Sequence, residues 1–227
     1  MSQMLASVNS LEEALIAEKE NIDIIDLKQP LQGALGALEI TDIQKIVSAL
    51  NNATIISATV GDLPMQPELI YKAVNNVANT GVDYIKIGFF PSSDWKPVIT
   101  KLQSLSQQGF KLIAVLFADQ QPELTSIPLF SDAGFSGVML DTMNKSNGSL
   151  TQVMPLETIQ EFVQLAKKHQ LLCGLAGSLR EPDITPLAKL DADYLGFRGA
   201  LCANHERTSE LDSQAMRDIQ TVLISTK

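Results

Sequence analysis

The sequence is poor in the residues that bind metal ions or form disulfide bridges. Its 227 residues include two cysteines, Cys173 and Cys202, and two histidines, His169 and His205. Neither pair has the close spacing of zinc ligands, such as C-x-x-C or H-x-x-x-H. We therefore expect no metal site and no Ser-His-Asp triad, and we expect both cysteines to be buried, reduced thiols.

Long apolar runs and positive charge are also scarce. No run approaches the roughly 20 apolar residues of a membrane-spanning helix, and residues 1–8 carry no basic stretch typical of a secretory signal. The 17 Lys and Arg residues stand against 26 Asp and Glu residues, a formal net charge of -9, whereas binding to nucleic-acid phosphates needs a basic surface. We expect a cytoplasmic protein that binds a small molecule, and neither nucleic acid nor a membrane. Self-association into a homo-oligomer stays open.

Two kinds of apolar segment alternate along the chain. Short runs rich in branched aliphatic residues predict eight β-strands, at 5–8, 24–28, 54–60, 84–88, 112–117, 137–142, 171–177 and 194–199. Helical periodicity predicts helices between and after them, at 10–20, 41–50, 67–80, 95–108, 122–133, 155–169, 182–189 and 209–225. Ser10 with Glu13, and Thr41 with Gln44, match the capping box that marks a helix start.

This alternation predicts the fold. Strands that are separated by helices run parallel and are buried on both faces. Eight strand–helix units of about 27 residues each are typical of a (β/α)8 barrel. The rival α/β fold, an open doubly wound sheet, lacks support because no G-x-G-x-x-G follows the first predicted strand. We predict one TIM-barrel domain over residues 1–227, with its active site at the C-terminal face of the strands.

Charged residues stand within or at the end of four predicted strands. Period-two alternation places them toward the barrel axis, between aliphatic residues that face the helices. They are Asp26, Lys28, Lys86, Asp141 and Arg198. The four strands alternate around the barrel, and alternate strands supply one layer of interior side chains. We therefore expect these residues to converge near the mouth, with Asp26 beneath the others.

A single lysine at a strand end can simply belong to a solvated rim, but two inward-facing lysines are harder to explain in that way. Lysine is rarely buried without a partner, and an unpaired buried charge is costly. A cluster of this kind suits an anionic substrate and proton transfer. A lysine in a desolvated site or beside another cation has a lowered pKa, and its neutral amine can form a Schiff base with an aldehyde or ketone.

Three further charged residues follow predicted strands. Lys145 lies in the loop after 137–142, which overhangs the mouth, and we expect it to contact substrate. Asp62 and Asp119 follow 54–60 and 112–117. We interpret both as turn residues that bond their own backbone.

The ends of the last two predicted strands resemble a phosphate site. In many barrels the loops after strands seven and eight hold a phosphate group. The candidate residues are Gly177, Ser178, Arg198, Gly199 and Ala200. Glycines allow backbone N–H groups to approach the ligand, while the serine and arginine side chains add donors. Each loop alone is explained by a tight turn, but together, beside two lysines, they favour a phosphorylated substrate.

Six segments resemble one enzyme family, (5-formylfuran-3-yl)methyl phosphate synthase of methanofuran-type cofactor biosynthesis. They are DLKQP at 26–30, GALGA at 33–37, DYIKIG at 83–88, LDT at 140–142 followed by Lys145, LAGS at 175–178 and GFRGA at 196–200. They run in family order across nearly the whole chain, which makes the set far more specific than any one segment. The loop KSNG at 145–148 is the point at which the pattern departs.

The resemblance implies a lyase that condenses two molecules of glyceraldehyde 3-phosphate into a phosphorylated furan aldehyde, with loss of phosphate and water. It implies that Lys28 forms the Schiff base and that Lys86 is the general acid/base. Asp26, Asp141 and Lys145 would orient these groups and assist proton transfer. It implies no metal and no organic cofactor. Two alternatives stay open: a class I aldolase or isomerase of another sugar phosphate, and a non-catalytic barrel that binds sugar phosphates.

Overall fold

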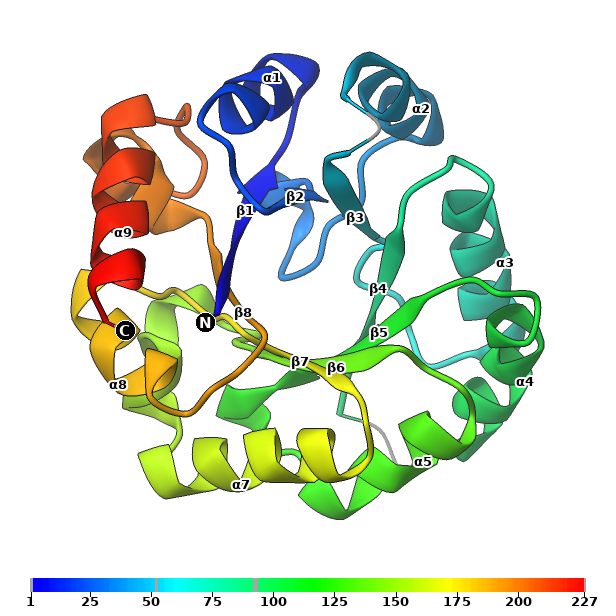
Figure 1. Cartoon of the computed structure of the whole chain (residues 1–227). Helices are drawn as coiled ribbons and strands as arrows, with labels where there is room; N and C mark the ends of the chain where they lie inside the picture. Colours follow the sequence, from blue (N-terminus) through cyan, green and yellow to red (C-terminus); the bar gives the residue numbers. More distant parts are fainter. Residues whose placement is uncertain (1, 52, 92–93, 227) are drawn as a thin grey trace.

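The strands form a closed parallel barrel. The computed structural model describes residues 2–51, 53–91 and 94–226, and Figure 1 shows the ring of strands with helices around it. Each strand pairs with its neighbours in the sequence, and β1 also pairs with β8, which closes the ring. The strands are β1 (Gln3–Val8), β2 (Ile24–Leu27), β3 (Ile55–Thr59), β4 (Tyr84–Phe89), β5 (Leu112–Phe117), β6 (Gly137–Asp141), β7 (Leu172–Leu175) and β8 (Tyr194–Phe197). The predicted TIM barrel is confirmed.

Helices cover the outside of the ring (Figure 1). They are α1 (Leu11–Lys19), α2 (Ile40–Ala49), α3 (Pro67–Ala78), α4 (Lys96–Ser106), α5 (Ile127–Asp132), α6 (Leu150–Val153), α7 (Leu156–Lys168), α8 (Glu181–Ala188) and α9 (Ser213–Ser225). Two predicted helices begin later than expected. Residues 122–126 contain a 3-10 turn before α5, and residues 209–212 belong to the loop before α9. The short helix α6, which follows β6, had no prediction.

The two predicted capping boxes have different outcomes. Ser10 caps α1, where its hydroxyl accepts a hydrogen bond from the backbone N–H of Glu13 at 3.2 Å. The prediction for Thr41 is wrong, because α2 already begins at Ile40 with Glu39 as its N-cap residue. Thr41 therefore lies inside the first turn.

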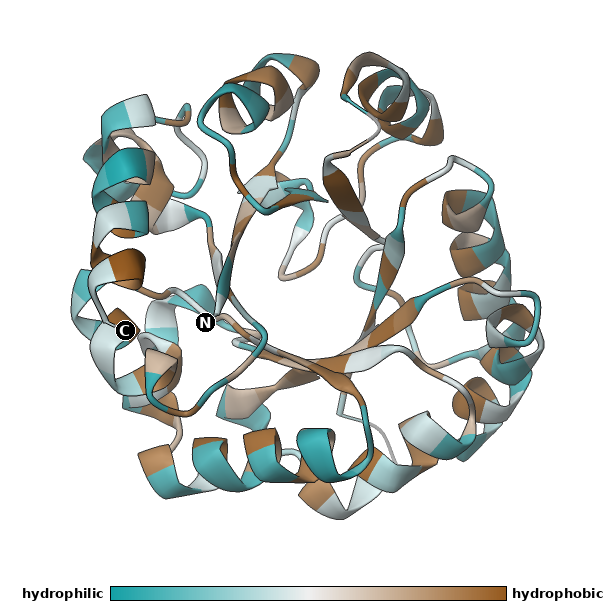
Figure 2. Cartoon of the chain, viewed as in Figure 1, coloured by the Kyte–Doolittle hydropathy of each residue, from teal (hydrophilic) through white to brown (hydrophobic). Residues whose placement is uncertain are grey.

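Apolar residues pack in two separate clusters. One lies between strands and helices and includes Ile25, Leu27 and Ile85. The other fills the barrel interior and includes Ile24 and Met139. Figure 2 shows hydrophobic residues along the strands and bands of both kinds on the helices, as amphipathic helices against a buried sheet require. Successive residues of one strand thus face opposite layers, which leaves alternate positions at the upper end free to carry polar groups inward.

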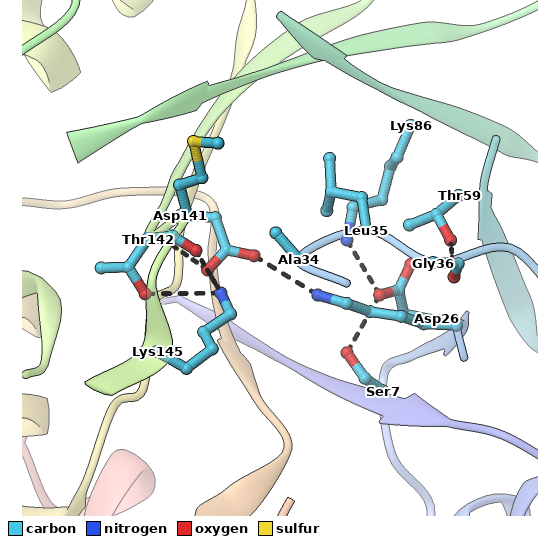
Figure 3. Close-up of polar contacts among 12 residues, drawn as sticks. Ser7, Asp26, Ala34, Leu35, Gly36, Thr59, Lys86, Asp141, Thr142 and Lys145 are labelled. Carbon is cyan, nitrogen blue, oxygen red and sulfur yellow. Dashed lines mark hydrogen bonds and ion pairs between the residues drawn. The ribbon is translucent and has the colours of Figure 1, made fainter. Parts of the chain in front are cut away.

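The β2–α2 loop folds over the mouth of the barrel. Ala34 and Leu35 from this loop join the interior cluster, and Figure 3 shows Leu35 beside Lys86. The Asp62 carboxylate accepts hydrogen bonds from the backbone N–H groups of Ala34 and Leu35, each at 2.7 Å. The interpretation of Asp62 as a self-bonded turn residue is therefore wrong, since it joins the β3 loop to the β2 loop.

Candidate active site

A cavity of about 230 Å3 lies at the C-terminal ends of the strands. Of the sequence-predicted residues, those that line it are Lys28, Lys86, Asp141, Lys145, Gly177, Ser178, Arg198 and Gly199. Asp26 lies behind this wall, bonded to Lys86. Ala200 is buried in the cluster between strands and helices and does not line the cavity. The structure thus brings together Lys86 on β4 and Asp141 on β6 with residues that follow β2, β6, β7 and β8, as the layer argument predicts.

The Lys86–Asp26 pair lies at the bottom of the cavity. The Lys86 ammonium donates to Asp26 Oδ2 at 2.9 Å (Figure 3). The same carboxylate accepts from the hydroxyl of Ser7 at 3.0 Å and from that of Ser57 at 2.7 Å. Asp26 is 0% exposed and Lys86 is 2% exposed, so the charges are compensated inside the protein rather than by water. The Lys86 ammonium is therefore held in one orientation.

Ser7 and Ser57 had no sequence prediction. They stand on β1 and β3, paired in register with Asp26 on β2 between them. Both serines can be recognised by one pattern. Each is a small hydroxyl residue within an aliphatic strand, at the position beside an inward-facing carboxylate.

A second ionic cluster surrounds Asp141. Lys145 donates to Asp141 Oδ1 (Figure 3), and Lys28 donates to Oδ2 at 3.4 Å. The backbone N–H of Thr142 adds a bond to Oδ1 at 2.7 Å. Burial by itself raises the pKa of Asp141, but the positive charges of Lys145 and Lys28 outweigh it and hold the pKa well below its usual range. Asp141 is therefore ionised near neutral pH and acts as a counter-charge between two lysines.

Lys28 differs chemically from an ordinary lysine. Lys28 is 6% exposed, and loss of hydration is the main reason why its pKa falls from 10.5 to about 8. The Asp141 charge opposes this shift, while Lys145 and Lys86 add to it. At pH 7 about a tenth of the Lys28 side chains carry a neutral amine, against about one in 3,000 for an unshifted lysine. The side chain that lines the cavity is therefore a competent nucleophile toward a carbonyl.

The loop that carries Lys145 is fixed from the neighbouring strand. Asp119, after β5, accepts hydrogen bonds from the backbone N–H groups of Met143 at 2.7 Å and Asn144 at 2.9 Å. Asp119 is thus wrongly interpreted as a self-bonded turn residue, because it holds the β6 loop. That loop in turn places the Lys145 ammonium 2.6 Å from the Thr142 carbonyl oxygen, beside Asp141.

The β7 loop packs closely against the β6 loop. Gly177 has a φ of 114°, and a Cβ atom there would come 2.8 Å from Thr142 Cγ2 and 3.0 Å from the Thr142 nitrogen. Both conditions demand glycine. Ser178 and Gly199 line the cavity as well, so it is bordered by residues of the loops after β7 and β8, where many barrels hold a phosphate group.

Arg198 departs from its expected role as a phosphate donor. Its guanidinium donates to both carboxylate oxygens of Glu13 and to the backbone oxygens of Ser7, Arg207 and Ser209. Guanidinium has five N–H donors, and these five bonds use all of them. The side chain of Arg198 holds α1 and the loop after β8 together, and its charge is compensated by Glu13.

Arg180, His205 and Arg207 also line the cavity and were not predicted to do so. Arg180 follows the LAGS segment by two residues, so its place in the loop after a predicted strand is the available signal. His205 and Arg207 lie in an irregular loop between β8 and α9, and the sequence pattern gives no indication of where that loop turns.

Two further findings concern metals and membranes. Among residues 2–51, 53–91 and 94–226, no group of three or more His, Cys, Asp or Glu side chains is arranged to hold a metal ion. Within the same residues, no helix combines the length and apolar character needed to cross a membrane. Cys173 and Cys202 are buried and unbridged, as predicted.

Comparison with known proteins gives a consistent result. The family model for 4-HFC-P synthase matches residues 4–220. A protein of Methylorubrum extorquens, assigned provisionally as a (5-formylfuran-3-yl)methyl phosphate synthase, is 39% identical over 92% of this chain and 86% of its own length. The enzymes of that name from Methanocaldococcus jannaschii and Methanothermobacter thermautotrophicus are 31% and 30% identical, and each alignment covers at least 96% of both proteins.

Solved structures show the same fold at low identity. A phosphoribosyl anthranilate isomerase superposes with a TM-score of 0.71 at 10% identity, over 99% of this chain and 100% of that one. The 3-hexulose-6-phosphate synthase of Salmonella typhimurium gives a TM-score of 0.70 at 14% identity, with the same coverage. These likenesses concern the TIM barrel alone.

Proposed function

The chain belongs to the 4-HFC-P synthase family, and from this premise we propose that it condenses two molecules of glyceraldehyde 3-phosphate into (5-formylfuran-3-yl)methyl phosphate. One phosphate and two molecules of water leave in the balanced reaction. The observation that carries the proposal is the buried Lys28 amine at the cavity wall, whose pKa is lowered to about 8.

The first step is attack of the Lys28 amine on the aldehyde carbon of one triose phosphate. Water leaves, and a protonated Schiff base joins the Lys28 nitrogen to the substrate. The positive nitrogen draws electrons from the neighbouring carbon, so that a proton can leave this carbon and phosphate can depart from the next one. Asp141, ionised and hydrogen-bonded to Lys28, stabilises the cationic intermediate because it supplies a negative charge in a desolvated site.

The second step joins the two substrates. Loss of phosphate leaves an enol whose terminal carbon, C3 of the Lys28-bound substrate, is the nucleophile. The branched skeleton of the product requires this carbon to join C2 of the second triose phosphate, which therefore reacts as its ketone isomer, dihydroxyacetone phosphate. The Lys86 ammonium, held by Asp26 at 2.9 Å, is placed to give a proton to the oxygen that becomes an alkoxide. A positioned acid or base of this kind is worth about 10²–10⁴-fold in rate. Ring closure and loss of two waters then give an aromatic furan, which makes the late steps strongly favourable. Hydrolysis of the imine consumes one water, frees Lys28 and leaves the aldehyde of the product.

Lys145 and the loops after β7 and β8 complete the proposal. Lys145 keeps Asp141 in place and adds a positive charge to the cavity wall. Gly177, Ser178 and Gly199 line the cavity, and the backbone N–H groups of these two loops are the donors that we assign to a substrate phosphate. Several cations in one cavity match a substrate pair that carries two phosphates, although the whole chain has a net charge of -9.

The test is incubation of the protein with glyceraldehyde 3-phosphate alone. We expect a furan absorbance to appear together with one equivalent of inorganic phosphate per product. Reversible interconversion of triose and hexose phosphates without phosphate release would instead identify an aldolase that uses the same lysine.

A second experiment separates catalysis from binding alone. Borohydride reduction in the presence of the substrate should leave a stable adduct on Lys28 that mass spectrometry locates. Absence of an adduct would favour a sugar-phosphate-binding barrel. The cytoplasmic location, which is an expectation from the sequence, is tested by cell fractionation. Self-association into a homo-oligomer, which the sequence leaves open, is tested by light scattering.

A further inference from the structure

Arg180 has the one buried polar side-chain atom without a hydrogen-bond partner in the part of the chain that the structure describes. Its Nη1 atom is buried and bonds to nothing, whereas Nη2 donates to the backbone oxygen of His205 at 3.0 Å. Buried donors in folded proteins are nearly always paired, and an unpaired donor that carries charge is more costly still. An unpaired guanidinium nitrogen at the wall of a cavity therefore indicates a missing acceptor.

The surroundings of Arg180 specify what this acceptor is. Both Nη atoms would lie 3.3 Å from a Cβ atom added at Gly199, so the guanidinium covers the backbone of the β8 loop. Gly177 and Ser178, from the same loop as Arg180, line the cavity beside it. Residues of two loops and the Arg180 side chain thus line one cavity, and loop N–H groups together with a guanidinium are a donor set that matches the tetrahedral oxygens of a phosphate group.

The contrast with Arg198 strengthens this assignment. Arg198 is paired with Glu13 and has no N–H donor left for a ligand. No carboxylate lies within ion-pair distance of Arg180 among the described residues. The Arg180 charge is therefore available to an anionic ligand, whereas that of Arg198 is already neutralised.

We propose that Arg180 binds the phosphate group of the substrate directly, and that Arg198 is a positioning residue. Arg198 donates to the backbone oxygens of Arg207 and Ser209, and so holds the loop whose His205 carbonyl orients Arg180. The proposal rests on the proposed function in one respect, that the substrate carries a phosphate. It adds that Arg180 selects phosphorylated over unphosphorylated aldehydes.

The experiment is titration calorimetry of the full chain with glycerol 3-phosphate and with inorganic phosphate. Neither probe has a carbonyl group, so binding is independent of the Schiff base. We expect Arg180→Gln to weaken binding of glycerol 3-phosphate by about 10- to 100-fold, the size of a lost hydrogen bond between charged groups. Arg180→Lys should restore part of it. Arg217→Gln removes an exposed guanidinium paired with Glu20 and should leave binding unchanged.

A second readout separates ligand binding from a structural role. Cyanoborohydride trapping of unphosphorylated glyceraldehyde on Lys28 should proceed in Arg180→Gln at the wild-type rate within twofold, with an unchanged melting temperature. Loss of this trapping, or a large drop in melting temperature, would overturn the proposal because Arg180 would then support the fold. If Arg180→Gln binds glycerol 3-phosphate with wild-type affinity, the Arg180 proposal is also overturned. Furan formation by the wild-type protein would still leave the proposed function intact. If the wild-type protein binds neither probe, the Arg180 proposal fails, whereas the proposed function is decided separately by furan formation from glyceraldehyde 3-phosphate.

Discussion

The pKa of Lys28 leads to a quantitative prediction for Schiff-base formation. Only the neutral amine attacks a carbonyl, and a pKa of about 8 makes its fraction rise about tenfold between pH 6 and pH 7, then level off above pH 9. For an unshifted lysine the neutral fraction would keep rising nearly tenfold per pH unit up to about pH 9.5. The rate of adduct formation on Lys28 should therefore bend near pH 8.

Two variants should move this bend in opposite directions. Lys145 lowers the pKa of Lys28 through charge repulsion, so Lys145→Gln should shift the bend to higher pH and reduce the rate at pH 7. Asp141 raises the pKa of Lys28 through attraction, so Asp141→Asn should shift the bend to lower pH. Opposite signs from two neighbouring substitutions are difficult to produce by general loosening of the site.

The assay is single-turnover trapping of glyceraldehyde with cyanoborohydride from pH 6 to pH 10. Unphosphorylated glyceraldehyde is used because it has no phosphate group to titrate. Mass spectrometry counts adducts on Lys28, and adducts on the exposed Lys72 in the same spectra give the pH profile of a surface lysine for comparison. A wild-type rate that still rises without a bend up to pH 10, or shifts of the same sign in both variants, would refute the electrostatic reasoning.

Four other substitutions test the roles assigned above. Lys28→Arg should abolish furan formation and keep the melting temperature, because arginine retains the charge and cannot form an imine; measurable turnover would remove Lys28 from the central role. Lys28→Met should stabilise the fold at pH 7 by up to about 3 kcal/mol, because the folded pKa is depressed from 10.5 to about 8. Burying the charged Lys28 destabilises the wild-type fold fully below pH 8, and this destabilisation disappears above about pH 10.5. Urea unfolding should therefore give wild type and Lys28→Met stabilities that converge at high pH. Lys86→Met should destabilise the fold by about 3–5 kcal/mol, since Asp26 loses its buried partner. Adding Asp26→Asn to the same chain should restore stability. In this double variant adduct trapping on Lys28 should persist, while the later steps of furan formation stay slow. Asp119→Ala should lower turnover about tenfold, because the substitution removes hydrogen bonds to a charged group. The backbone amides of Met143 and Asn144 should then exchange rapidly with solvent. Unchanged exchange would show that Asp119 does not hold the loop.

The inward orientation of the central residues follows from sequence periodicity. Asp26, Lys86 and Asp141 stand among aliphatic residues on short strands, and a strand has only two faces. Once the aliphatic neighbours Ile25 and Ile85 pack against helices, the charged residues point into the barrel. The order of residues within each strand is enough for this inference, because in a parallel barrel every second side chain of a strand points toward the barrel axis.

The roles of the loop residues depend on contacts between distant parts of the chain. Arg198 is neutralised by Glu13 on α1, and Asp119 bonds the β6 loop. The sequence around Glu13 is compatible with an ordinary helix start, and the sequence around Asp119 with a simple turn. The partner is a backbone group or side chain that closure of the barrel brings close, so no local pattern announces it.

Alternation of strands and helices in the amino-acid order determined the barrel, its polar upper interior and the lysines that face it. Folding in three dimensions decided which charges are compensated: Lys86 by Asp26, Arg198 by Glu13, and Lys28 only weakly by Asp141 at 3.4 Å. The distinction is physical, because a side chain's direction depends on its own strand, whereas its hydration and its charge partners depend on every element that surrounds it. Lys28 and Arg180 owe their reactivity and their binding capacity to that second set of conditions.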